Sequence, residues 1–89
     1  MQHETDIKYK GGLRDLAQDL GNLRYDKLEE FLHVFAEKIE HDAASDGGRG
    51  RAMLAESLKE TAASLRMANF HMAEAWRISK PHMKEDGSC

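Results

Sequence analysis

One segment of the chain combines the carboxylate and imidazole groups that bind transition metals. Its members follow one another at spacings of three, four and four residues, which places them in one row on a helix; they are Glu30, His33, Glu37 and His41. Such groups bind zinc, and Glu-x-x-His pairs on facing helices hold di-iron sites. Here the motif occurs once and lies opposite Leu28 and Phe35. We therefore expect a solvated row of Glu and His pairs, with no metal and no other cofactor.

Catalytic motifs are equally sparse. No Gly-x-Ser-x-Gly occurs, and the glycine-rich stretch 47–50 lacks both the Lys-Ser/Thr and the preceding strand of a phosphate loop. The single cysteine, Cys89, excludes an intrachain disulfide and a cysteine-built zinc site. The sequence thus predicts a protein that is not an enzyme.

Composition narrows the class of partner. The 89 residues carry a net charge of −3, whereas proteins dedicated to nucleic-acid binding are usually basic. The charge is unevenly placed, with three basic and six acidic residues in 24–42 but six basic and three acidic residues in 49–80. No apolar run approaches the ~18 residues of a membrane span, so we expect no membrane partner and a cytoplasmic location.

The spacing of apolar residues predicts helices over about 13–20, 24–43 and 51–79. Their expected core residues recur every three or four positions. They are Leu13, Leu16, Leu20, then Leu28, Leu32, Phe35, Ile39 with Phe31, Ala36 and Ala43 broadening the stripe, and finally Leu54, Leu58, Ala62, Leu65, Met72, Trp76. Asp26 and Glu29 have capping-box spacing, although Asn22 is an alternative cap for an earlier start. A glycine-dense connection, 44–50, separates the second and third helices, and Pro81 is expected to follow the end of the third.

These elements predict an all-α fold, an antiparallel helical hairpin preceded by a short helix. The expected organisation is a flexible tail over 1–12, one helical domain over 13–80 and a second flexible tail over 81–89. A chain this small buries little surface alone, so we expect two hairpins to associate as a dimeric four-helix bundle.

A second apolar stripe on the last helix points away from the Leu58 and Leu65 stripe. With the basic residues beside it, the predicted interaction surface consists of Met53, Lys59, Ala63, Arg66, Met67, Phe70, Arg77 and Ile78. We expect this surface to bind a second copy or one partner protein, as in a small adaptor, regulator or inhibitor. Alternatives are that the N-terminal helix covers the stripe, or that its residues are scattered and inconsequential.

Two further features leave alternatives open. Lys59, Arg66 and Arg77 beside Phe70 make a nucleic-acid-binding hairpin the second functional hypothesis, although the acidic total argues against it. Asn69 lies near the core stripe, where it either pairs with its symmetry mate in a dimer or points sideways to solvent.

Overall fold

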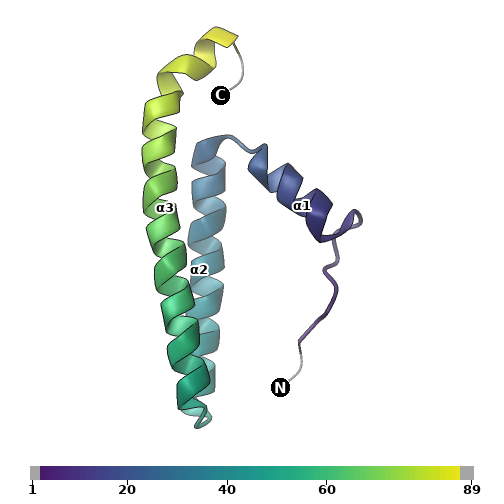
Figure 1. The fold of residues 1–89 in the computed structure, drawn as a ribbon, viewed down its shortest axis with the longest axis vertical. Helices are drawn as coiled ribbons and strands as arrows, with labels where there is room; N and C mark the ends of the chain where they lie inside the picture. Colours follow the sequence, from purple (N-terminus) through teal and green to yellow (C-terminus); the bar gives the residue numbers. More distant parts are fainter. Residues whose placement is uncertain (1–2, 87–89) are drawn as a thin grey trace.

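The computed structural model describes residues 3–86, with side chains up to residue 82. The described part of the chain forms three α-helices, α1 (Gly12–Gly21), α2 (Tyr25–Gly48) and α3 (Ala52–Asp86). The predicted all-α class is therefore confirmed. As Figure 1 shows, α2 and α3 form a long antiparallel hairpin, and α1 projects from the end of the hairpin opposite its turn.

Alanines form the contact between α2 and α3. Ala36 and Ala43 of α2 and Ala55 and Ala62 of α3 are between 0% and 5% exposed, and they are the only buried apolar residues in the described part. Each pair is seven residues apart, so both members lie on the same helix face. Because a methyl group is small, the helix axes approach closely along this alanine seam.

The large apolar residues consequently stand beside the seam and are covered only in part. Phe35 is 42% exposed, Leu28, Leu32 and Ile39 are only half-buried, and no large side chain in the described part is fully buried. The prediction that Phe35 belongs to the buried core is wrong. The alanine seam occupies the line of closest approach, so the larger side chains stand beside it.

The turn of the hairpin is shorter than the sequence suggests. The expected connection over 44–50 is wrong, since α2 continues to Gly48. Gly47 lies on the seam, where an added Cβ would stand 3.5 Å from the Ala55 Cβ. Asp46, only 8% exposed, accepts a hydrogen bond at 2.8 Å from Arg51, which ties the end of α2 to the start of α3. Gly50 supplies the positive φ of 81° that closes the turn.

Two other helix boundaries differ from the expected ones. Arg24 is the N-cap residue of α2, and its side chain makes no capping hydrogen bond. Asp26 lies in the first turn of the helix, where it pairs with Arg24 at 2.7 Å instead of capping the helix. The helix α3 passes through Pro81 to Asp86 instead of ending at Ser79. Figure 1 shows α3 bending near this end, as expected where proline removes a backbone hydrogen bond. The extreme ends of the two predicted tails, with Cys89, lie outside the described residues.

The first helix is not packed on the hairpin. It has no buried residue, its Leu13 is 67% exposed, and the extensive packing in the structure is that of α2 on α3. Helix α1 therefore leaves the outward surface of α3 uncovered, contrary to one sequence-based alternative.

The resulting shape is extended. The radius of gyration is 16.1 Å, compared with about 12 Å for a compact domain of this length. The chain exposes 7042 Å², whereas a compact monomer of its mass exposes about 5300 Å². Among the described residues, no helix has the length and hydropathy required to cross a bilayer.

Candidate protein interface

The alanine seam divides the hairpin into two long sides. Successive helical residues are about 100° apart, so Phe35, which precedes Ala36, and Glu37, which follows it, lie on opposite sides of α2. On α3, Arg66 lies four residues, about one turn, after Ala62. It contacts Glu40 of α2, which is on the same side of the hairpin as Glu37. As a result, both helices present apolar residues on one side of the hairpin and charged residues on the other.

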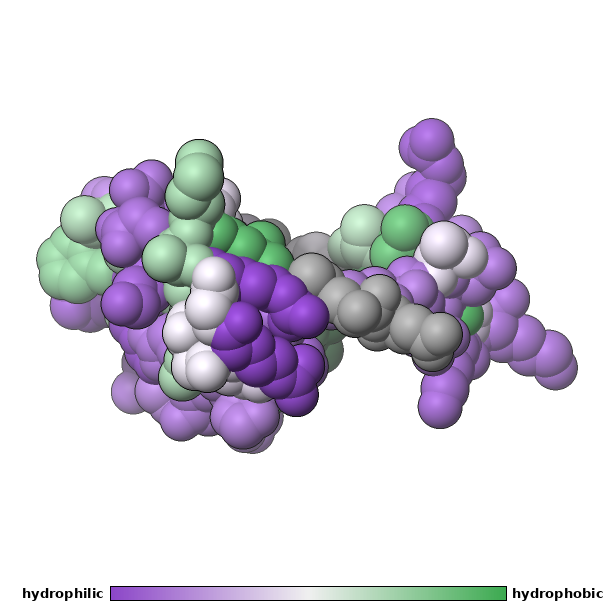
Figure 2. All heavy atoms as spheres, turned by 90° about the horizontal axis from the view of Figure 1, so that it is seen from below, coloured by the Kyte–Doolittle hydropathy of each residue, from purple (hydrophilic) through white to green (hydrophobic). Residues whose placement is uncertain are grey.

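The apolar side forms what we call the lateral apolar face. Helix α2 contributes Leu28, Phe31, Leu32, Phe35 and Ile39, and helix α3 contributes Leu54, Leu58, Leu65 and Met72. All of them are half-buried or exposed. At the centre of the α2 portion, the rings of Phe31 and Phe35 lie 5.7 Å apart. Figure 2, which looks along the hairpin from its turn, shows hydrophobic side chains gathered on the upper side and mainly hydrophilic ones below.

Charged residues stand at both ends of this face. At the open end of the hairpin, the Arg24 guanidinium lies 5.4 Å and the Lys80 ammonium 5.9 Å from the centroid of the Trp76 ring. Toward the turn, Asp42 accepts hydrogen bonds from Lys38 at 2.6 and 2.8 Å, which lower the pKa of its carboxyl group. Arg24 is itself paired with Asp26, as Asp42 is with Lys38, so each end of the lateral apolar face carries an ion pair formed within the chain.

The other side of the hairpin is held by ionic contacts. Arg66 donates to both carboxylate oxygens of Glu40, at 2.7 and 2.8 Å, and its third nitrogen lies 3.2 Å from His33 Nδ1. The hydrogen bonds from Arg66 hold the pKa of the Glu40 carboxyl group below its ordinary value. This bidentate pair joins α2 to α3, although its exposure limits its contribution to stability.

The residues of the predicted interaction surface are at the surface, but they do not form one continuous apolar patch. Met53 is 89% exposed, and Met67 and Ile78 are each about 60% exposed. A rise of about 1.5 Å per residue places them roughly 21 and 17 Å apart along α3. The charged or polar Glu60 and His71 share their outward-facing side.

The remaining residues of that predicted surface are also accessible. Lys59 and Ala63 are exposed, and Phe70 stacks edge-on against His71 with ring centroids 5.5 Å apart. Arg77 pairs with Glu74 on its own helix. Together with the Arg66 pair, this contact neutralises two of the three cations expected to attract a nucleic acid.

The row of Glu and His residues lies on the exposed charged side of α2. Within it, His33 Nε2 is 3.4 Å from Glu37 Oε2, and Glu30 and His41 are exposed. No three His, Cys, Asp or Glu side chains in the described part are arranged to hold a metal ion. The geometry seen there is that of a solvated i,i+4 pair.

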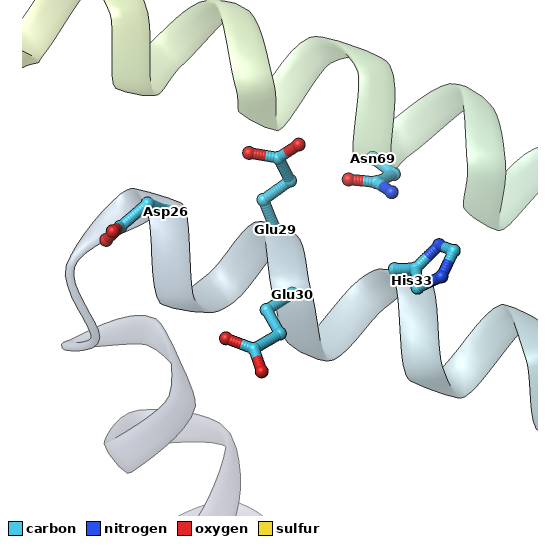
Figure 3. A pocket seen from close by; sticks show the side chains of 5 residues that line it. All are labelled: Asp26, Glu29, Glu30, His33 and Asn69. Carbon is cyan, nitrogen blue, oxygen red and sulfur yellow. The ribbon is translucent and has the colours of Figure 1, made fainter.

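A shallow pocket of about 370 Å³ lies between the helices near the open end. It is lined by Asp26, Glu29, Glu30, His33 and Asn69. In Figure 3, Glu29 and Asn69 face each other from α2 and α3, while Glu30 points away. The Asn69 Oδ1 atom is buried without a hydrogen-bond partner. Asn69 thus points toward α2 beside His33 rather than onto the lateral apolar face.

Sequence reasoning missed the lateral apolar face because it placed the largest apolar residues against the neighbouring helix. The available signal was the seven-residue repeat of alanine in both long helices, Ala36 with Ala43 and Ala55 with Ala62. Small residues at that spacing mark the line on which two helices meet, and they leave the large residues on its flank.

Comparisons of the chain with protein-family models, with curated proteins and with solved structures found no match.

Proposed function

We propose that this protein is a non-enzymatic protein-protein interaction module whose working unit is a homodimeric four-helix bundle. Two hairpins join through their lateral apolar faces, so that the partly buried leucines and the exposed phenylalanines of each copy become the core of the pair. This places the dimer contact on a different side of α3 from the stripe that the sequence indicates.

The incomplete core of the single hairpin is the observation that carries this proposal. Only alanines are buried among the apolar residues described, and the chain exposes 7042 Å². That area is about 1700 Å² above the value for a compact monomer. A standard protein interface covers about 800 Å² on each partner, so one such contact accounts for about half of the excess. Two amphipathic helices packed side by side make up one half of a four-helix bundle.

The dimer leaves other surfaces free for a partner protein. Helix α1 displays Leu13, Leu16 and Leu20 in one row, and none of them is buried. A helix of only ten residues is marginally stable by itself in water, and binding to a partner would stabilise it. Met53 and Met67 on the outward surface of α3 offer further adaptable apolar contacts.

The nucleic-acid hypothesis receives no comparable support. Arg66 is held by Glu40, and Arg77 by Glu74, which leaves Lys59 as the one cation of the predicted flank with no ion pair among the described residues. Protein binding is therefore the function that we propose.

Sedimentation equilibrium tests the proposed unit. The expected mass is about twice the 10.1 kDa of one chain, and a constant mass of one chain at every concentration overturns it. The partner-binding function is tested by using the chain as bait in a lysate, with Leu16→Asp in α1 as the variant and Gln18→Asp, on an exposed position of the same helix, as the control. We expect the leucine variant alone to lose nuclease-resistant partners. Equal capture by both variants removes α1 as the binding element, and loss of all partners after nuclease treatment favours nucleic acid.

A further inference from the structure

We propose that α1 is an autoinhibitory strap, which folds back antiparallel on α2, covers part of the lateral apolar face and so competes with the proposed dimer. The structure shows the open form, in which α1 points away from the hairpin (Figure 1). This inference rests on the proposed function and adds its regulation, because closure hides the leucines of α1 and part of the dimer contact together. It follows from the connection between the two helices and from the spacing of their apolar residues.

The connection between α1 and α2 can bend at one residue. Arg24 has φ −55° and ψ 143°, an extended backbone between two helical segments. Before it, the Leu23 amide donates to the Leu20 carbonyl oxygen at 3.1 Å. After it, the Lys27 amide donates to the Arg24 carbonyl oxygen at 2.9 Å. In the described part of the chain, no backbone hydrogen bond joins the residues before Arg24 to those after it. A rotation at this residue therefore moves α1 without breaking either helix.

The chain already contains a closed hairpin with a connection of the same length. Residues 49–51 join α2 to α3 and residues 22–24 join α1 to α2, three residues in each case. In the closed α2–α3 hairpin, an added Cβ at Gly47 would lie 3.5 Å from the Ala55 Cβ, so these two residues are level. Gly47 lies one residue before the end of α2, and Ala55 three residues after the start of α3. This pair gives the register that a three-residue connection produces in this chain.

The same register brings the apolar residues of α1 onto those of α2. One residue before the end of α1 is Leu20, and three residues after the start of α2 is Leu28. Away from the connection, the next apolar residues follow after four and then three positions in both helices. The facing pairs are therefore Leu20 with Leu28, Leu16 with Leu32, and Leu13 with Phe35. Each leucine of α1 meets a large apolar residue of the lateral apolar face.

Closure supplies contacts that these residues lack in the open form. Leu13 is 67% exposed and Phe35 is 42% exposed, and the other four members of the pairs are only partly buried. With ten residues, α1 is about 15 Å long, so it covers the face over residues 28–35. The part nearer the turn, with Leu54 and Leu58, stays uncovered. That remaining apolar surface still favours a dimer, which requires α1 to open.

Closure and dimerisation exclude each other because both cover Leu28, Leu32 and Phe35. A short connection keeps α1 at a high local concentration beside α2, and this concentration does not change when the protein is diluted. Dilution therefore favours the closed form, whereas dimer formation displaces α1 and exposes its leucines. A partner protein that binds those leucines in turn favours the dimer, since the coupling between two binding events is reciprocal.

Disulfide trapping in dilute protein tests the closed form. In a Cys89→Ser background, Leu16→Cys with Leu32→Cys places two thiols on one facing pair. The matched control is Gln18→Cys with Leu32→Cys, because Gln18 is exposed on the other side of α1. A disulfide needs β-carbons about 4 Å apart, which closure supplies for the facing pair alone. With glutathione disulfide as oxidant, the facing pair should form its intramolecular link severalfold faster, as counted by mass spectrometry of the unfolded chain.

The competition is measured without cross-linking, by sedimentation equilibrium of two single variants. Leu16→Asp should lower the dimer dissociation constant severalfold, because a chain that cannot close does not have to open before it pairs. If about half of the chains are closed, the dissociation constant of the parent protein is raised about fourfold, since both copies must open. Gln18→Asp adds the same charge away from the facing pairs and should leave the dissociation constant unchanged.

The outcomes separate closure from the dimer itself. Faster linking of the facing pair, together with a tighter dimer in Leu16→Asp, supports the proposal. Equal linking rates overturn closure and leave the proposed dimer standing. Faster linking with an unchanged or raised dissociation constant in Leu16→Asp overturns the competition. A protein that links fast but is monomeric at every concentration overturns the proposed dimer and its regulation, while closure stands.

Discussion

Replacement of Phe35 by alanine probes the lateral apolar face at its centre. Phe35 is 42% exposed in the single hairpin, which leaves about 80 Å² of an aromatic side chain that buries 150 to 250 Å² when fully covered. In the dimer two copies are covered, or about 160 Å², and at ~25 cal/mol per Å² their burial contributes about 4 kcal/mol. Alanine retains roughly a quarter of this area, so the expected loss is about 3 kcal/mol.

That loss corresponds to roughly a hundredfold higher dimer dissociation constant. Sedimentation equilibrium or dilution calorimetry measures it directly. The matched control is Val34→Ala, which truncates the adjacent residue of the same helix. Val34 is 54% exposed on the outer side of α2, away from the lateral apolar face, and its replacement should leave the dissociation constant unchanged.

Equal effects of the two substitutions would refute the assignment of the interface. A third variant, Phe70→Glu, distinguishes this face from the stripe that the sequence indicates. Phe70 is 60% exposed on the charged side of the hairpin, so the variant should remain dimeric. Conversion to a monomer by Phe70→Glu, with no effect of Phe35→Ala, would return the interface to the predicted stripe.

Three further predictions concern the hairpin itself. Ala36→Leu should force the helices apart and reduce the free energy of unfolding by about 1 to 3 kcal/mol in urea titrations, whereas Ala44→Leu, at an exposed position, should change it little; equal losses would argue against a tight alanine seam. Gly50→Ala should cost about 1 to 2 kcal/mol in the same assay, because φ is 81° at this residue, and an unchanged stability would contradict the turn geometry. Because the pKa of Glu40 is lower in the folded state than in the unfolded state, its pair with Arg66 should stabilise the fold fully above the ordinary glutamate pKa of about 4.3 and progressively less as the pH falls through the folded-state pKa. Glu40→Gln should abolish that part of the pH dependence, and an unchanged pH profile in this variant would show that the pair contributes nothing.

The sequence predicts the class of fold well because the apolar spacing of each helix is regular. It identifies all three helices and the antiparallel hairpin. It fails at the ends of helices, where packing overrides local preference. Gly47 would end an isolated helix, but α2 continues through it to Gly48, where the chain packs against the start of α3. The capping function expected of Asp26 is replaced by its pair with Arg24.

The candidate interface was less accessible to sequence reasoning. Periodicity shows that Phe35, Leu58 and Leu65 share a stripe, but it does not show how far the stripe is rotated from the neighbouring helix. That rotation is set by the alanines, since a seam containing Ala36 and Ala62 gains contact along the whole hairpin only when the larger residues stand to one side. Part of a surface expected to be core is thereby left accessible on the single hairpin.

The dependence of thermal stability on protein concentration tests the central claim most directly, because a hairpin that completes its core only in a dimer must lose stability on dilution. For a dimer of two 89-residue chains, a hundredfold dilution should lower the midpoint of unfolding, followed by circular dichroism, by about 5 to 10 °C. A midpoint that stays constant over the same dilution would show that the single hairpin is a complete fold, and would contradict the account.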